Sequence, residues 1–177
     1  MSETQHQSLK VHAIVPAAGA GRRLAPGAAK PKQYQLLLGR PMLEWTIQCL
    51  CAHPVISAVT AVLAPGDTDF MNLRFSGPTP VDWVAGGETR AHSVRNALRH
   101  VVVSTDAQWV LVHDAARPCL DRPSLDRLLR DGLSNEDGAI LAVPVSDTLK
   151  RSAGDKEPVI ESTIDRDRLW AAQTPQL

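Results

Sequence analysis

Short apolar runs that alternate with helical patterns constrain the fold of this chain more than any other feature. We expect strands over five runs, at residues 11–15, 58–63, 81–85, 109–113 and 139–143. Most of these runs are continuously apolar, which is typical of strands buried on both faces. Such strands lie in parallel sheets that helices cover from both sides. The sequence therefore predicts an α/β fold with a mainly parallel sheet.

Three helical patterns separate these runs. The first covers residues 41–53, the second follows Gly86-Gly87, and the third covers residues 123–133, with Asp121 suited to cap its start. The apolar stripe of the second helix consists of Ala91, Val94 and Leu98. We expect these helices to cover the two faces of the sheet.

The last part of the chain breaks this alternation. Residues 145–151 and 159–164 resemble two strands, and the polar tract 152–158 separates them. Two strands joined in this way form an antiparallel pair. We expect an excursion that projects from the domain.

Composition excludes several classes of partner. Lys plus Arg and Asp plus Glu number 19 each, so the chain lacks the basic excess of a general nucleic-acid binder. No apolar run approaches the ~20 residues that span a bilayer. Residues 1–10 are polar and are expected to be a flexible lead. The three cysteines do not make a disulfide framework, which favours a cytoplasmic protein.

A glycine-rich segment, residues 16–23 (PAAGAGRR), directly follows the first strand. Small residues let backbone N–H groups approach phosphate oxygens closely, and Gly19 and Gly21 have conformations open to them that other residues avoid. Arg22 and Arg23 can clamp a polyphosphate. The alternative is a tight strand-to-helix turn with two solvated arginines. The segment matches neither a dinucleotide fingerprint nor a Walker loop.

Two other segments, at Gly86-Gly87 and His113-Asp114, lie where ligands bind in such sheets, outside the carboxyl ends of the strands. Residues 30–33 are a further candidate. Pro31 disfavours a helix over residues 30–33, so we expect a loop there. A fixed loop can hold Lys32 close to a negative charge. The alternative is that Lys30 and Lys32 are ordinary surface residues. Residues 86–93 form a second glycine-rich turn that could hold a base or ribose.

Asp114 ends a buried strand, where an unpaired carboxylate is costly. Mg²⁺ shared with phosphate oxygens is one natural partner. Pairing with Arg117, or capping of a turn, is the other. His113 is interpreted as structural.

Taken together, these segments resemble the 2-C-methyl-D-erythritol 4-phosphate cytidylyltransferases of the non-mevalonate isoprenoid pathway. The matching pieces are PAAGAGRR at 16–23, PKQY at 31–34, GGETRAHSV at 86–94, VLVHDAARP at 110–118, PVSDTLKR at 144–151 and DRDRLWAAQTPQ at 165–176. These six segments follow one another in the right order and are spread over residues 16–176, nearly the whole length of the chain.

The resemblance implies a Rossmann-like nucleotidyltransferase fold with a projecting β-arm that clasps a second subunit. It implies transfer of CMP from CTP to methylerythritol phosphate, with Mg²⁺ and release of pyrophosphate. Arg23 and Lys32 would stabilise the transition state, Asp114 would lie near the metal, and Thr148 and Arg166 on the arm would contact the polyol phosphate. The residues expected to contact CTP are Pro16, Ala17, Ala18, Gly19, Gly21, Gly87, Glu88, Ser93 and Ala115.

On this basis residues 11–144 are the nucleotidyltransferase domain, 145–168 the β-arm and 169–177 a return to the core. The family continues past the TPQ segment, through parts that carry a further acidic residue and a lysine. A chain ending at Leu177 is therefore expected to bind nucleotide but to catalyse weakly or not at all. The alternatives are a cytidylyltransferase for another polyol phosphate, such as ribitol phosphate, and a nucleotide-binding dimer without catalysis.

Overall fold

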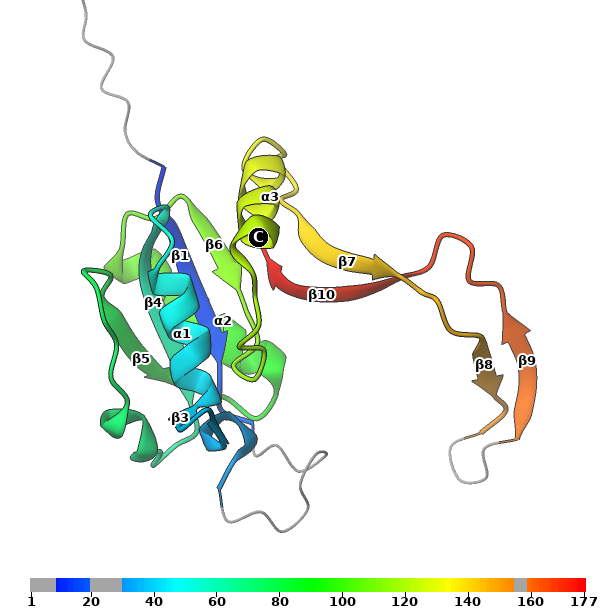
Figure 1. Cartoon of the computed structure of the whole chain (residues 1–177), viewed down its shortest axis with the longest axis horizontal. Coiled ribbons are helices and arrows are strands. Elements are labelled where there is room, and N and C mark those ends of the chain that lie inside the picture. Colours follow the sequence, from blue (N-terminus) through cyan, green and yellow to red (C-terminus); the bar gives the residue numbers. More distant parts are fainter. Residues whose placement is uncertain (1–8, 20–29, 155–158) are drawn as a thin grey trace, which may run out of the picture.

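The computed structural model describes residues 9–19, 30–154 and 159–177 (Figure 1). Gly21, Arg22 and Arg23, which the sequence places in the glycine-rich segment, lie outside the described residues.

A six-stranded sheet with the order β5-β4-β1-β6-β10-β7 forms the centre of the molecule. Its parallel part consists of β1 (Val11–Pro16), β4 (Ile56–Leu63), β5 (Val81–Ala85) and β6 (Trp109–Val112). Strand β10 (Trp170–Gln176) lies antiparallel between β6 and β7 (Ile140–Pro144). The predicted mainly parallel sheet is confirmed, whereas β10 was not expected as a strand.

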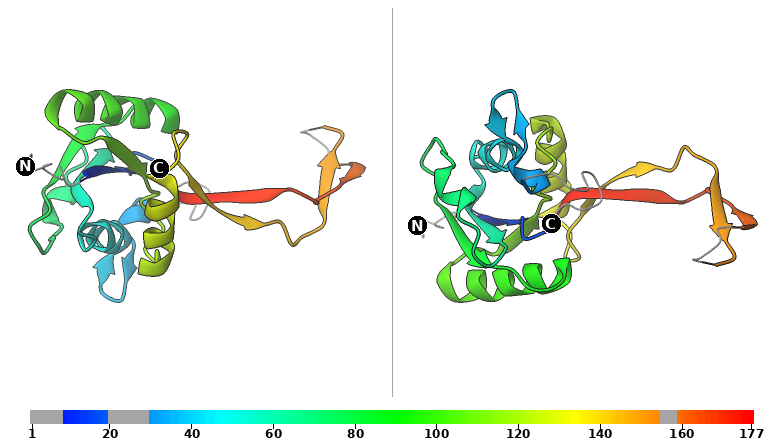
Figure 2. Two further views of the ribbon diagram at one scale, coloured as in Figure 1. Left: turned by 90° about the horizontal axis from the view of Figure 1, so that it is seen from above. Right: turned by 90° about the horizontal axis from the view of Figure 1, so that it is seen from below.

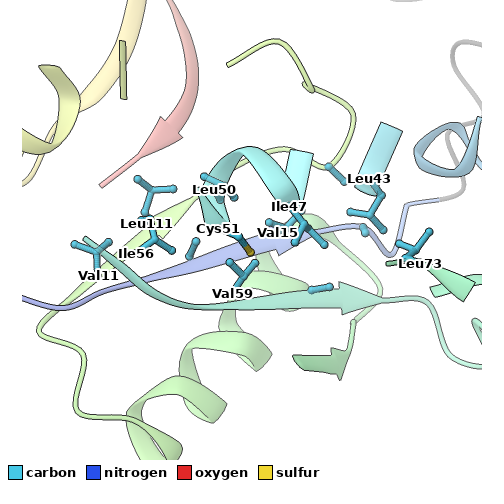
Figure 3. Close-up of a cluster of buried hydrophobic side chains, with 14 of the residues drawn as sticks. Val11, Val15, Leu43, Ile47, Leu50, Cys51, Ile56, Val59, Leu73 and Leu111 are labelled. Carbon is cyan, nitrogen blue, oxygen red and sulfur yellow. The ribbon is translucent and has the colours of Figure 1, made fainter. Parts of the chain in front are cut away.

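Helices cover both faces of this sheet, as predicted. Helices α1 (Met42–Cys51) and α3 (Arg122–Gly132) pack on one face, and α2 (Arg90–Ser104) packs on the other (Figures 1 and 2). Asp121 caps α3 by accepting a 2.8 Å hydrogen bond from the Ser124 N–H. The larger core lies under α1, where Leu43, Ile47 and Leu50 meet β1 and β4 (Figure 3).

The buried face of α2 differs from the predicted stripe. Ser93, Ala97 and Val101 are buried against the sheet, while Ala91 and Leu98 are exposed. A helix whose inward residues are small can approach the sheet closely, so Ala97 packs beside Ile14 and Val62. Three apolar residues were too few to determine the rotation of the helix about its axis.

Strand β7 is also less buried than the sequence suggests. Ile140 and Val143 are 54% and 50% exposed because β7 is the outermost strand of the sheet.

Short elements complete the body, namely the turns η1 (Lys32–Tyr34) and η2 (Asp69–Asn72) and the hairpin of β2 (Leu36–Leu37) and β3 (Arg40–Pro41).

Strands β8 (Leu149–Ser152) and β9 (Ile160–Ile164) form a separate antiparallel pair. Strands β7 and β10 run out from the body and carry this pair at their far end (Figures 1 and 2). The predicted projecting β-arm is therefore present. Within the described residues, no helix is long and apolar enough to cross a membrane.

Candidate functional site

A cavity of about 240 Å³ lies where the carboxyl ends of β1 and β5 meet the start of α2. Its walls are Pro16, Ala18, Gly19, Gly87, Glu88, Thr89, Arg90 and Ser93. Six of these residues were expected to contact a nucleotide from the sequence. The fold therefore brings two glycine-rich segments, about 70 residues apart in the chain, to one pocket.

Glycine at position 86 lets these two segments touch. A Cβ atom added there would lie 2.5 Å from the Cβ of Ala18 and 3.2 Å from the carbonyl oxygen of Leu63. The neighbouring Gly87 N–H donates a 3.1 Å hydrogen bond to the buried Ser93 hydroxyl. Ser93 thus fixes the second glycine-rich turn against the first residues of α2.

The N-terminus of α2 lies at the same cavity, with Thr89, Arg90 and Ser93 on its wall. Thr89 caps the helix by accepting a 3.1 Å hydrogen bond from the His92 N–H. The partial positive charge of a helix N-terminus favours phosphate. Arg90 adds a full positive charge in the first turn, where the helix dipole disfavours it. Arg90 was not predicted as a site residue from the sequence. A positive charge directly after the capping residue Thr89 is unfavourable for the helix, and this could have indicated a functional role.

Asp114 lies beside the cavity and accepts hydrogen bonds from two arginines. The Nη2 atom of Arg90 is 3.0 Å from its Oδ1 atom, and the Nε atom of Arg117 is 3.1 Å from its Oδ2 atom. The pairing with Arg117 that the sequence left open is therefore present, and Arg90 is a second partner. Because both arginines are half-exposed, incoming groups can reach them and compete for these contacts.

His113 and Thr174 support the position of Asp114. The Asp114 N–H donates a 3.2 Å hydrogen bond to the Thr174 hydroxyl, which lies 2.9 Å from Nδ1 of His113. Nε2 of His113 lies 3.0 Å from the carbonyl oxygen of Arg117, an acceptor. Nε2 must therefore carry the proton, and Nδ1 accepts from Thr174. Burial lowers the pKa of His113, so the ring is neutral, and its role is structural as predicted.

Lys32 lies in the turn η1, and its neighbours anchor it. Gln33 donates a 2.6 Å hydrogen bond to the carbonyl oxygen of Ala17, and Tyr34 donates a 2.8 Å hydrogen bond to Asp67. Lys32 itself is half-buried. It does not line the cavity, although Gln33 ties its turn to the first glycine-rich segment.

The remaining predicted residues fall into two groups. Ala17 and Ala115 are buried and do not line the cavity, and the Ala115 carbonyl accepts a 3.0 Å hydrogen bond from Thr46. Thr148 and Arg166 are exposed and do not line this cavity, and the arm that carries them projects away from the body (Figure 2). Arg166 donates to the Ser146 carbonyl.

A divalent cation would find two carboxylates here, Glu88 on the cavity wall and Asp114 beside it. Residues 9–19, 30–154 and 159–177 contain no group of three His, Cys, Asp or Glu side chains that could hold a metal by themselves. Mg²⁺ bound with nucleotides takes one or two carboxylates and completes its coordination with phosphate oxygens and water. Asp114 could bind such a shared ion if it gave up its contact with one of the two arginines. The described residues do not fit a metal site whose ligands all come from the protein.

Comparison with known proteins agrees with this geometry. Residues 11–177 match the model of the 2-C-methyl-D-erythritol 4-phosphate cytidylyltransferase family, IspD. The chain belongs to this family. A cytidylyltransferase of this name from Azoarcus sp. (strain BH72) is 48% identical over 168 residues, which are 93% of this chain and 70% of that protein. Another, from Dechloromonas aromatica (strain RCB), is 51% identical over 94% of this chain and 72% of that protein.

A solved structure of a 4-diphosphocytidyl-2C-methyl-D-erythritol synthase also resembles this IspD chain. The TM-score is 0.79 at 35% identity, over 95% of this chain and 74% of that one. The chain thus has the Rossmann-like nucleotidyltransferase fold of IspD, and it spans about 70% of the length of the relatives named above.

Proposed function

We propose that this chain transfers CMP from CTP to 2-C-methyl-D-erythritol 4-phosphate and releases pyrophosphate. The observation that carries the proposal is the meeting of Ala18-Gly19, Gly87 and the N-terminus of α2 at one cavity. In a chain of the IspD family, such a cavity with backbone N–H groups and Arg90 on its walls suits the phosphates of CTP.

The reaction joins two anions, so the enzyme must bring them together and offset their charge. A phosphate oxygen of the acceptor attacks the α-phosphorus in line, the bond from that phosphorus to the bridging oxygen breaks, and pyrophosphate leaves. Lys32 and Arg23 supply the positive charges that stabilise the developing charge on the α-phosphate oxygens. Asp114 would hold Mg²⁺ against the phosphates, where the ion neutralises part of their charge.

The small residues of the site bind the nucleotide. Gly87, Glu88 and Ser93 line one wall of the cavity and are assigned to the base and ribose. Pro16, Ala18 and Gly19 line the other wall, and with Gly21 they are assigned to the phosphates. The buried Ala17 supports this wall, because its N–H and its carbonyl already bond to Val62 and Gln33. The buried Ala115 is assigned to CTP through its backbone.

The arm gives the proposed enzyme its second substrate site, and it requires a homodimer. Thr148 and Arg166 are assigned to the acceptor phosphate, but the arm that carries them projects away from the body of its own chain (Figure 2). A partner's arm must therefore complete each cavity. The arm also exposes apolar side chains, with Val159 and Ile160 each 64% exposed, and a second copy would bury such groups. The proposed enzyme acts in the cytoplasm.

Pyrophosphate release tests the proposed reaction. The chain is incubated with CTP, Mg²⁺ and either 2-C-methyl-D-erythritol 4-phosphate or ribitol 5-phosphate. We expect pyrophosphate only with both CTP and an acceptor, and faster release with methylerythritol phosphate. Equal or faster release with ribitol phosphate would favour the alternative polyol substrate. CTP binding without any release would favour a nucleotide-binding dimer.

A further inference from the structure

The turn that carries Lys32 is held by three neighbouring side chains. Lys30 forms a 3.1 Å ion pair with Asp69, and Tyr34 donates to Asp67, so both of these contacts reach the segment around η2. Gln33 points the other way and reaches the glycine-rich segment after β1. Among the described residues, this third contact is the one side-chain hydrogen bond that joins the turn to the segment whose Pro16 and Ala18 line the cavity.

The contact of Gln33 is short, buried and defined in direction. Its side-chain nitrogen Nε2 lies 2.6 Å from the carbonyl oxygen of Ala17, and the residue is 5% exposed. A carbonyl oxygen only accepts, so the amide must present its NH₂ group there. The other polar backbone group of Ala17 is also fixed, because its N–H donates a 2.8 Å hydrogen bond to Val62 on β4.

Both polar backbone groups of Ala17 are therefore held in place beside the cavity. The hydrogen bond from Gln33 fixes the position of the turn relative to Ala17. Its neighbours Pro16 and Ala18 line the cavity, and Lys32 directly precedes Gln33. A lysine side chain is long and flexible, so the place its ammonium reaches depends on where its backbone is held. A shift of about 1 Å in a positioned group can lower turnover by ~10²-fold.

We infer that Gln33 is a positioning residue of the reaction, which sets Lys32 at the distance from the phosphate-binding segment that the transition state needs. This inference rests on the proposed cytidylyl transfer. Gln33 touches no reacting atom. It acts through Lys32, and this distinguishes it from a residue that merely fills the core.

The first test replaces Gln33 by methionine, which keeps the volume and removes the donor. We expect kcat to fall about 10-fold or more, while the KM for CTP changes only about threefold. Gln48→Met is the matched control. Its amide also bridges a loop, with hydrogen bonds of 3.0 and 2.8 Å to Ser76, but neither residue lines the cavity. This variant should keep the turnover of the unchanged chain.

A double-mutant cycle with Lys32→Ala separates positioning from general support. If Gln33 acts through Lys32, Gln33→Met lowers kcat strongly in the unchanged chain and by less than about twofold in the Lys32→Ala chain. Equal fold-losses in both chains would overturn the inference.

The same double-mutant cycle can be carried out with the Kd for CTP as the measured quantity. This tests the role of Gln33 independently of the proposed reaction. If the unchanged chain binds CTP but releases no pyrophosphate, the reaction is wrong, and the Kd values for CTP replace kcat in the cycle. Non-additive Kd changes would then support the link between Gln33 and Lys32, and additive changes would refute it.

Gln33→Glu is the second variant, and it tests the positioning role of Gln33 if Gln33→Met does not fold. A neutral carboxyl can donate to the Ala17 oxygen, whereas a carboxylate cannot. Burial raises the pKa of a glutamate in such a place. We expect the kcat of this variant, divided by that of the unchanged chain, to rise several-fold as pH falls from about 8 to about 5.5. A constant ratio would contradict the positioning role.

Discussion

Arg90 and Asp114 form an ion pair at the rim of the nucleotide cavity, with 3.0 Å between Nη2 and Oδ1. The pair joins the first turn of α2 to the end of β6, 24 residues further along the chain. A bound nucleotide with Mg²⁺ would compete for both partners, because phosphate attracts Arg90 and the cation attracts Asp114. The ion pair therefore holds two groups of the proposed site close together and in reach of their ligands.

Replacing Asp114 by asparagine should abolish most of the activity. The change keeps the shape of the side chain and removes the charge that a divalent cation and the two arginines need. We expect kcat/KM to fall by ~10²-fold or more, and the Mg²⁺ concentration for half-maximal rate to rise. Asp131→Asn is the control, because Asp131 pairs with Arg130 at the exposed surface of α3. Unchanged Mg²⁺ dependence in Asp114→Asn would remove Asp114 from the metal site.

Lys32→Ala and Arg23→Ala should each lower kcat by about 10²-fold or more, the effect of losing one group that stabilises the transition state. Rates at saturating CTP and acceptor measure this directly. If either variant raises only the KM, its residue binds the ground state, and its assigned role is wrong.

Gly86→Ala should damage the cavity without touching a charged group. The added Cβ would lie 2.5 Å from the Cβ of Ala18, so the two glycine-rich segments must move apart. Strain of this kind typically costs about 1–3 kcal/mol, and we expect CTP affinity to fall about 10-fold. Titration calorimetry and thermal unfolding measure the two effects. In Gly154→Ala no atom of the described residues lies within 4 Å of the added Cβ, so both quantities should stay unchanged.

The sequence predicted the parts of the site that depend on local patterns. A buried strand followed by small residues predicts a phosphate-binding segment, and Pro16, Ala18 and Gly19 do line the cavity. Gly87 and Ser93 come to the same cavity because parallel strands end at one edge of the sheet. Their contacts with CTP remain predictions.

Two other features, the Arg90–Asp114 ion pair and strand β10, depend on tertiary packing and give only a weak signal in the sequence. The ion pair of Arg90 with Asp114 is set by how α2 lies on the sheet, and the sequence misjudged the buried face of that helix. Strand β10 was missed because a largely exposed, mixed polar and apolar segment is inserted antiparallel between two other strands. Its Thr174 completes the support of His113 from 61 residues away.

The stability of the protein should fall in mild acid because of its buried histidines. Burial lowers the pKa of His113 and of His12 below the ordinary value of 6.5. The folded chain therefore binds fewer protons than the unfolded chain once the pH drops below about 6.5, and protonation favours unfolding. Each such group lowers the free energy of unfolding by at most about 1.4 kcal/mol per pH unit.

Urea unfolding at pH 7.5, 6.5 and 5.5 measures this dependence. The His113→Gln variant should have a smaller loss of stability between pH 6.5 and 5.5 than the unchanged chain, because one titrating group is gone. His92→Gln changes an exposed imidazole and should keep the original pH dependence. Identical slopes for all three chains would mean that His113 is not held neutral by the fold.

Mixing two inactive variants tests whether the arm completes a neighbour's cavity. Arg166→Ala damages only the arm, and Lys32→Ala damages only the part of the site that the body supplies. In a mixed dimer, the intact cavity of the first variant meets the intact arm of the second. One of its two sites is then whole.

Equal amounts of the two variants that exchange subunits freely give about half mixed dimers, so the activity should return to about a quarter of the unchanged level. Neither variant alone should recover on the same treatment. If the mixture stays as inactive as its components although the subunits exchange, Arg166 acts within its own chain. In that case the arm would have to fold back toward the body, contrary to its extended path along β7 and β10 (Figure 1).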